Sequence, residues 1–228
     1  MAKLPTRRSS KGEIDAFLKK SRDITEFQQR QPRLLFAIDA TASRQPTWDT
    51  ACQQQQAMFR AASSTTSLRV QLCYYRGFNE FFASPWLDSS EQLASTMGRV
   101  YCEGGHTQIA RLLRHAMAEH GKSSIKAVVF IGDALEENPD TLCQLAGQCG
   151  ILRLPLFMFQ EGYDHSVENC FKQMSKLSGG AYARFDQHSA SALAALLGAV
   201  ASFAAGGREA LEKQDSESAK LLLEQLHN

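Results

Sequence analysis

The stretch RLLFAIDATASRQPTWD, residues 33–49, places an aspartate and two hydroxyl side chains directly after an apolar run. A run of this kind is typical of a strand that is covered on both faces of a sheet. Asp39, Thr41 and Ser43 follow at alternate positions, so three oxygen-bearing side chains leave the strand together. The pattern has two interpretations: a polar strand exit that caps a turn, or half of an oxygen-lined ion site.

Apolar strands and helical patterns alternate along the rest of the chain. Gly77 marks a short turn between the expected strands 68–76 and 79–86, which should therefore be antiparallel. Gly121 is expected to end a strong helix over residues 107–120. The alternation favours an α/β fold with a doubly wound, mostly parallel central sheet of about six strands, one of them an antiparallel edge strand, with helices on both faces. The expected later strands are 68–76, 79–86, 125–132, 153–160 and 181–185, and the expected helices are 47–63, 89–100, 107–120, 139–150, 165–180 and 188–205.

The chain length of 228 residues suits one large domain with short extensions. We expect an N-terminal tail and lead-in helix over residues 1–30, the main domain over 31–205, and a C-terminal helical tail over 206–228. The tail pattern leaves three roles open: a partner-binding helix, a coiled-coil arm, or a helix folded on its own domain.

The net charge of +1 gives no basic footprint for nucleic acid or for a membrane surface. The first ten residues lack the apolar segment of a secretory signal, and no apolar run reaches the roughly 18 residues of a membrane span. The six cysteines form no C-x-x-C pair, which favours buried free thiols over disulfides or a zinc site. We therefore expect a cytoplasmic protein with no membrane span and no nucleic-acid partner.

Two further loops carry oxygen atoms at element boundaries: EGGHTQIA, residues 103–110, contains Thr107, and FIGDALEEN, residues 130–138, contains Asp133. Ligands of doubly wound sheets bind at the carboxyl ends of the strands, so these loops are expected to meet the first one there. Gly104 and Gly105 permit a tight backbone path that brings Thr107 toward the first loop. Since hard divalent cations prefer oxygen ligands, we predict a site made of Asp39, Thr41, Ser43, Thr107 and Asp133.

Simpler interpretations exist for the individual residues. Thr107 could be a helix N-cap, and Asp133 a solvated residue after a buried strand. His106 is expected to be an exposed loop residue rather than a transition-metal ligand or pH sensor. Glu136 and Glu137 could add charge to the rim of a site, or be ordinary acids at a helix start. For most of the aromatic residues between 48 and 86, core or edge packing is simpler than a partner surface.

The three loops resemble the metal-ion-dependent adhesion site (MIDAS) of the von Willebrand factor A (VWA, integrin I-like) domain family. DATAS, residues 39–43, matches the family pattern D-x-S-x-S, with Thr in place of the first Ser. GGHT, residues 104–107, matches Gly-Gly-x-Thr, and GDA, residues 132–134, stands where Thr-Asp-Gly is usual. The resemblance covers about residues 31–205.

The resemblance implies that Thr41 and Ser43 bind Mg²⁺ (or Mn²⁺ or Ca²⁺) directly, and that Thr107 binds it directly or through water. Asp39 and Asp133 would act mainly through waters or as outer acceptors. An Asp or Glu of another protein would take the open position, so the implied function is metal-dependent protein–protein interaction without catalysis. The resemblance to intracellular members of the family implies an adaptor in a bacterial multi-protein assembly, such as one that contains an ATPase.

Two other functions stay open. FAIDATAS and IGDALEEN are partly similar to motifs of haloacid-dehalogenase phosphatases, which would make the chain a Mg²⁺-dependent phosphomonoesterase, although Thr41 stands where that chemistry needs a second carboxylate. The third possibility is a scaffold that binds through its terminal helices. No Ser/His/Asp order, P-loop or H-E-x-x-H motif is present, and no catalytic residue is assigned.

Overall fold

The computed structural model describes residues 11–42, 45–54, 68–185 and 190–226. Its contacts divide the chain into two units, residues 1–31 and 32–228. The first unit contains helix α1, Lys11–Arg30, whose described side chains from Lys11 to Ser21 are all exposed. Ile14, Phe17 and Leu18 are among them, so this helix presents apolar side chains to solvent.

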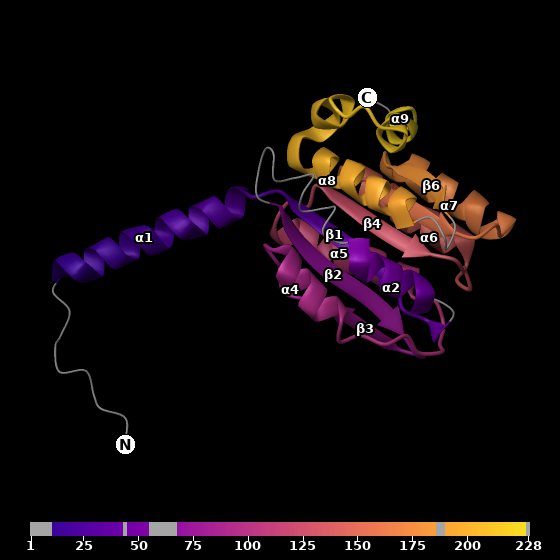
Figure 1. The fold of residues 1–228 in the computed structure, drawn as a ribbon, viewed down its shortest axis with the longest axis horizontal. Helices are drawn as coiled ribbons and strands as arrows, with labels where there is room; N and C mark the ends of the chain where they lie inside the picture. Colours follow the sequence, from indigo (N-terminus) through magenta and orange to yellow (C-terminus); the bar gives the residue numbers. More distant parts are fainter. Residues whose placement is uncertain (1–10, 43–44, 55–67, 186–189, 227–228) are drawn as a thin grey trace, which may run out of the picture. The chain divides into compact units, whose positions relative to one another are not determined.

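The second unit is built on one six-stranded sheet with the strand order β3-β2-β1-β4-β5-β6 (Figure 1). Every neighbouring pair is parallel except the hairpin β2–β3, as the sequence predicted. The strands are β1 (Arg33–Asp39), β2 (Arg69–Arg76), β3 (Glu80–Ala83), β4 (Ala127–Gly132), β5 (Leu156–Glu161) and β6 (Ala181–Phe185).

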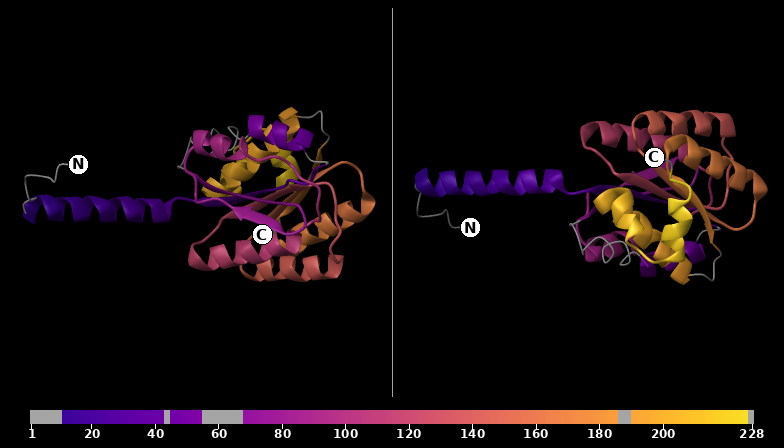
Figure 2. Two further views of the ribbon diagram at one scale, coloured as in Figure 1. Left: turned by 90° about the horizontal axis from the view of Figure 1, so that it is seen from below. Right: turned by 90° about the horizontal axis from the view of Figure 1, so that it is seen from above.

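Helices cover both faces of this sheet (Figure 2). Alternate residues of β1 show why: Leu34, Phe36 and Ile38 join one core cluster, while Leu35 and Ala37 join the other. The first cluster is closed by α2 (Gln45–Gln54), α4 (Ser90–Met97) and α8 (Ala190–Glu212), and the second by α5 (Ile109–Lys122), α6 (Pro139–Ile151) and α7 (His165–Ser178).

The order of the strands fixes where a ligand would bind. The chain moves from β1 outward to β2 and β3, and then returns to place β4 on the other side of β1. The switch in direction therefore lies between β1 and β4, whose carboxyl ends are neighbours because Ile38 pairs with Ile131. Asp39 and Asp133 stand at these two ends.

The C-terminal helix α9, Glu217–Leu223, packs on the sheet domain. Gly206 and Gly207 interrupt the helical geometry of α8, and Gly207 has a φ of 68°, a conformation that favours glycine. After this kink, Leu211, Ala219 and Leu222 are fully buried in the first core cluster. The tail is thus a helix folded on its own domain, one of the three roles that the sequence left open.

The same tail covers one edge of the sheet. The side-chain amide of Gln225 accepts a hydrogen bond from the backbone N–H of Tyr182 at 2.9 Å and donates one to its carbonyl oxygen at 2.8 Å. At Tyr182 these two bonds take the place of those that a neighbouring strand would make on the edge of β6.

Helix α8 is also the one helix of the described residues that is long and apolar enough to cross a membrane, over Ser191–Glu212, with a mean hydropathy of 1.3. Core helices of folded domains meet the same criterion. Leu193, Leu197 and Val200 of α8 are fully buried in the first core cluster, which is the packing of a core helix.

Several element boundaries differ from the sequence-based expectations. Helix α2 begins two residues earlier than expected, and the end expected for it at residue 63 lies outside the described residues. Helix α5 does not end at Gly121 but continues to Lys122, where the N–H of Ser123 still bonds to the carbonyl of Glu119. Strand β5 begins at Leu156 rather than at Arg153, because Arg153 has a φ of 56° and lies in a turn.

Candidate metal centre

Asp39, the last residue of β1, has a fully buried side chain. Its Oδ1 accepts a hydrogen bond from the backbone N–H of Thr41 at 2.8 Å, which turns the chain away from the sheet. Its Oδ2 accepts a hydrogen bond from the hydroxyl of Tyr75 at 3.3 Å. Tyr75 is the residue of β2 that pairs with Asp39. Burial, and then the charge of Asp39, raise the pKa of Tyr75 well above its ordinary value, so the phenol stays protonated and donates. The hydrogen bonds of Asp39 thus form a polar strand exit, and the same bonds fix the orientation of its carboxylate at the candidate site.

Two further acids influence the same phenol through their charge. The negative charges of Glu137 and Asp133 also raise the pKa of Tyr75. Asp133 directly follows β4 and is partly buried, so it is not the fully solvated residue of the simpler interpretation. Of these three acids, the carboxylate of Asp39 is the one that bonds to the phenol, and the other two act on it through their charge.

The loop between α4 and α5 is tied to its neighbours by backbone hydrogen bonds. The N–H of Glu103 bonds to the carbonyl of Ala40 at 3.0 Å, and the N–H of His106 bonds to the carbonyl of Gly77 at 3.2 Å. A Cβ on Gly105 would stand 1.8 Å from that carbonyl oxygen, whereas one on Gly104 would meet nothing within 4 Å. The tight path predicted for this loop therefore depends on Gly105.

Thr107 joins the second loop to the third. Its side chain is nearly buried, and its Oγ1 accepts a hydrogen bond from the backbone N–H of Glu136 at 3.1 Å. In return, its backbone N–H donates to Oε2 of Glu136 at 2.9 Å. This reciprocal pair holds the Thr107 hydroxyl at the junction of the two loops.

Thr107 is not the N-cap of α5, contrary to its simpler interpretation. The helix begins at Ile109, and Gln108 at the cap position makes no side-chain capping bond. Glu137 takes that role from the third loop, because its carboxylate accepts from the backbone N–H groups of Ile109 and Ala110 at 2.5 and 2.9 Å. Burial raises the pKa of Glu137, and hydrogen bonds from these two N–H donors and from the side chain of Thr107 oppose the rise.

The three loops enclose a cavity of about 230 Å³. Thr41 comes from the first loop, Thr107 from the second and Glu136 from the third, and the remaining lining residues are small: Ala42, Gly104, Gly105 and Ala134. Asp39 and Asp133 do not line it, although each is within two residues of a residue that does. Ser43, the fifth predicted ligand, lies outside the described residues.

The chemistry of these residues fits a hard divalent cation. The cavity offers two hydroxyl oxygens and a carboxylate, with two further carboxylates beside it, and Mg²⁺ prefers oxygen ligands and retains several waters. In the part of the chain that the structure describes, no group of three or more His, Cys, Asp or Glu is arranged to hold a metal. A cation would therefore depend on the Thr hydroxyls, as the motif requires.

Sequence reasoning did not single out Tyr75, and it treated Glu136 and Glu137 only as rim charges or ordinary helix-start acids. Tyr75 becomes recognisable once the register of β1 and β2 is known, because it pairs with Asp39. His106 is exposed, as expected, with its Nδ1 3.1 Å from Oε2 of Glu136 and its ring beside that of the exposed Phe78.

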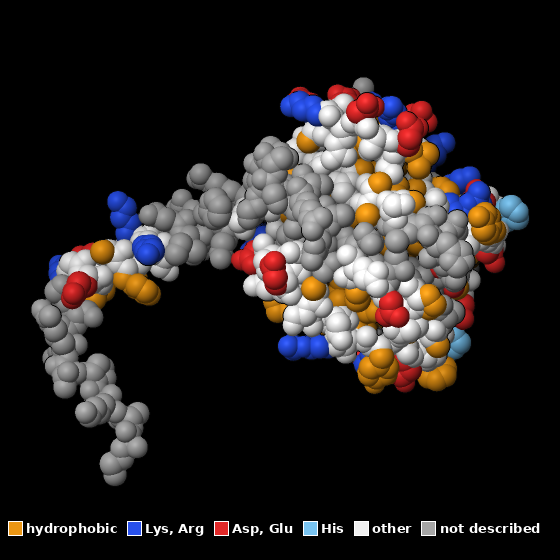
Figure 3. Space-filling model, viewed as in Figure 1, with side chains coloured by type: hydrophobic (Ala, Val, Ile, Leu, Met, Phe, Trp, Pro, Cys, Tyr) orange, Lys and Arg blue, Asp and Glu red, His pale blue; other side chains and the backbone are white. Residues whose placement is uncertain are grey.

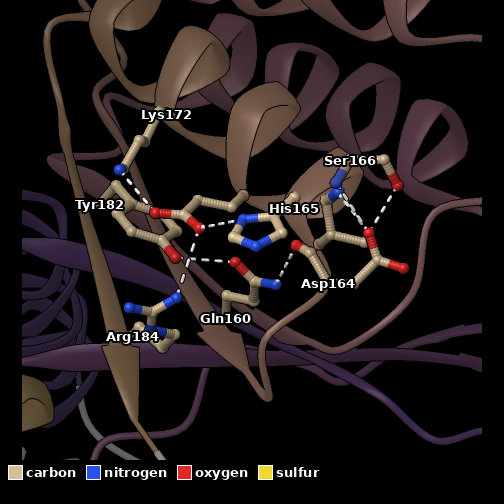
Figure 4. A network of polar contacts seen from close by, with 9 residues as sticks. Gln160, Asp164, His165, Ser166, Lys172, Tyr182 and Arg184 are labelled. Atoms are coloured by element: carbon tan, nitrogen blue, oxygen red, sulfur yellow. Dashed lines mark hydrogen bonds and ion pairs between the residues drawn. The ribbon is translucent and has the colours of Figure 1, made fainter.

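A second polar cluster lies at the carboxyl end of β5 (Figure 4). Buried Gln160 accepts a hydrogen bond from the hydroxyl of Tyr182 at 2.7 Å and donates one to the carbonyl of Asp164 at 2.9 Å. The carboxylate of Asp164 caps α7, and Glu168 on that helix pairs with Lys172 and Arg184. No residue of this cluster lines the cavity described above.

Comparison with solved structures identifies proteins that have a similar fold. The sequence matches no protein-family model and no curated protein. Among solved structures, the SpRpn10 VWA domain superposes with a TM-score of 0.57 at 10% identity, over 70% of this chain and 90% of its own. The vWF domain of the type V pili tip protein Mfa5 from Porphyromonas gingivalis has a TM-score of 0.60 at 10% identity, over 82% and 97%. An aerotolerance-related membrane protein from Bacteroides fragilis has a TM-score of 0.55 at 12% identity, over 72% and 94%.

These similarities concern the arrangement of the strands and helices, since the identities are too low to carry a site or a partner. They agree with the six-stranded sheet, its one antiparallel strand and its helices on both faces. The chain has the fold of a VWA domain.

Proposed function

We propose that this chain is a metal-dependent protein-binding module. Mg²⁺ (or Mn²⁺ or Ca²⁺) would be held by Thr41, Ser43 and Thr107, with Asp39 and Asp133 acting through waters or as outer acceptors. The cation supplies an electrostatic bridge to an Asp or Glu of another protein. The observation that carries this proposal is the meeting of three sequence-distant loops at one cavity that Thr41 and Thr107 line.

The residues of the chain prepare this site in distinct ways. Tyr75 and the N–H of Thr41 hold the buried carboxylate of Asp39 in one orientation. Glu136 holds Thr107 in place through the reciprocal pair of hydrogen bonds. Neutral hydroxyl ligands leave most of the cation's charge uncompensated, which favours an incoming carboxylate.

The proposed partner is a protein, and we propose that the chain acts as an intracellular adaptor in a multi-protein assembly, such as one built around an ATPase. On the face shown in Figure 3, acidic and basic side chains are interspersed among the described residues, which suits a protein partner better than nucleic acid. We propose a cytoplasmic location, which the six free thiols support. Burial raises the pKa of Cys149 to about 11 and that of Cys170 to about 12, so these two are not reactive nucleophiles.

Calorimetric titration with Mn²⁺ tests the metal site directly. The wild-type chain is expected to bind one Mn²⁺, and Thr107→Val, which keeps the shape but removes the hydroxyl, is expected to weaken binding at least about tenfold. Thr141→Val is the matched control, since Thr141 is exposed on α6 away from the cavity lining. Absence of Mn²⁺ uptake at millimolar concentration in the wild type would overturn the proposal.

A phosphatase of haloacid-dehalogenase type remains the enzymatic alternative. The structure places Thr41, not a second carboxylate, two residues after Asp39, with its backbone N–H bonded to that aspartate. A proton donor for the leaving group is therefore lacking at that position. We expect no Mg²⁺-dependent hydrolysis of p-nitrophenyl phosphate; hydrolysis that Asp39→Asn abolishes would make the chain an enzyme instead.

The scaffold alternative is weakened at the C-terminal tail. Leu211, Leu222 and Leu226 are buried in the core, so most of the apolar side chains of the tail pack within the domain. Leu221 and the exposed apolar residues of α1 are what this alternative retains.

A further inference from the structure

Glu136 already brings a carboxylate to the cavity in which the cation would be bound. It is the acidic member of the cavity lining, and its side chain is half exposed. Oε2 accepts the N–H of Thr107 at 2.9 Å and lies 3.1 Å from Nδ1 of His106. An acid of this chain therefore lies beside one of the predicted ligands, and its half-exposed side chain lines the cavity.

The neighbouring acid, Glu137, differs from Glu136 because both of its carboxylate oxygens already accept hydrogen bonds. Both of its oxygens receive N–H groups of α5, from Ile109 and Ala110, so it is fixed as a helix cap. The contacts found for Glu136 are both made by Oε2. A carboxylate has about four acceptor positions, so Glu136 can keep its bond to Thr107 and still accept a cation.

We infer that Glu136 is an internal substitute for the partner's acid: it binds the cation when no partner is present and is displaced when a partner carboxylate arrives. The inference rests on the proposed function, because it assigns a role toward the same cation. Glu136 would then fill the open coordination position of the cation in the isolated chain. The isolated chain would retain its cation more tightly than the hydroxyl ligands alone allow, and weak free acids would not occupy the open position.

Two readouts on the purified chain test this role. Calorimetry measures the Mn²⁺ affinity, and water-proton relaxation measures how much water contacts the bound Mn²⁺. Glu136→Gln retains an acceptor for the N–H of Thr107 but removes the charge. The variant is expected to bind Mn²⁺ at least about tenfold more weakly and to show a higher relaxivity per bound ion, because water takes the vacated position. Added acetate is expected to lower that relaxivity in the variant and to leave the wild type unchanged.

Glu103→Gln is the matched control. Glu103 lies on the second loop, is similarly exposed and carries the same charge, but it faces Arg76 and does not line the cavity. It is expected to change the Mn²⁺ affinity less than twofold and the relaxivity not at all. Glu136→Ala, which removes the acid together with its contact to Thr107, must shift both readouts in the same direction as Glu136→Gln.

The outcomes separate the inference from the function on which it rests. If the wild type binds Mn²⁺ and Glu136→Gln behaves like Glu103→Gln, the role of Glu136 is wrong and the metal site stands. If the wild type binds no Mn²⁺, both fail. A tenfold weaker affinity with raised, acetate-sensitive relaxivity supports the inference.

Discussion

Two groups of polar residues lie at carboxyl ends of the same sheet, and they differ in what their hydrogen bonds leave available. At β5, the amide of Gln160 is bonded to Tyr182 and to the carbonyl of Asp164. The neighbouring acids are also engaged, because Asp164 caps helix α7 and Glu168 forms ion pairs with basic side chains. At β1 and β4, buried Asp39 is bonded to Tyr75 and to the N–H of Thr41, yet the adjacent hydroxyls line a cavity.

The difference shows that polar residues at strand ends do not by themselves make a ligand site. Both groups contain a buried tyrosine hydroxyl that donates to a buried polar side chain. Only the group at β1 and β4 lies at the switch in strand order, where the loops diverge and leave space between them. We therefore propose cation binding for the group at β1 and β4 and structural support for the group at β5, and the following predictions test that division.

The largest effect is expected from Gly105→Ala. The new Cβ would collide with the backbone of Gly77, so the second loop must shift and carry Thr107 with it. We expect a loss of about 3 kcal/mol in the free energy of unfolding and no measurable Mn²⁺ binding. Gly104→Ala, which meets nothing within 4 Å, is the control for both measurements. Equal behaviour of the two variants would contradict the role given to the loop path.

The two buried tyrosines give a paired test. Tyr75→Phe removes the hydroxyl that positions Asp39, and we expect the Mn²⁺ affinity to fall about tenfold because outer-shell partners orient a metal site. Tyr182→Phe leaves the buried oxygen of Gln160 without that donor, and we expect a loss of about 1–2 kcal/mol in the free energy of unfolding with unchanged Mn²⁺ affinity. Calorimetry and urea unfolding of both variants measure the two effects. A change in Mn²⁺ affinity on Tyr182→Phe would break the division between the two regions.

The smallest effect concerns acid sensitivity at the second region. Hydrogen bonds from Ser166 and Val167 lower the pKa of Asp164, and Lys172 lowers that of Glu168. Folded-state pKa values below the unfolded ones mean that this stabilisation is complete near neutral pH and is lost as the pH falls below about 4. We expect Asp164→Asn to lower the melting temperature at pH 7 and to make it less dependent on pH between 5 and 3. A wild-type slope in the variant would exclude this contribution.

The mostly parallel sheet, its one antiparallel strand and the layered fold could be predicted because the evidence is local, whereas the order of the strands was not predicted. Apolar runs such as residues 33–38 and 127–131 are strands buried on both faces, and helices must connect strands of this kind. The three oxygen-bearing loops could be predicted for a similar reason, since their motifs are short and lie at strand or helix ends. Whether they bind a cation stays a prediction.

The contacts that shape the site could not be predicted in this way. Glu137 caps a helix that begins 28 residues earlier in the chain, and Glu136 bonds to Thr107 across 29 residues. Tyr75 reaches Asp39 only because the two strands pair in that register. Each of these contacts is set by how loops pack together, and an acid before a helix has the same appearance in sequence whether it caps its own helix or another one.

Anomalous X-ray scattering from crystals soaked in Mn²⁺ tests the assignment most directly, because it locates the ion. We expect one anomalous peak in the cavity between Thr41 and Thr107, with no peak at the carboxyl end of β5. A well-occupied peak beside Asp164 and Glu168, or no peak in the cavity at millimolar Mn²⁺, would contradict the assignment.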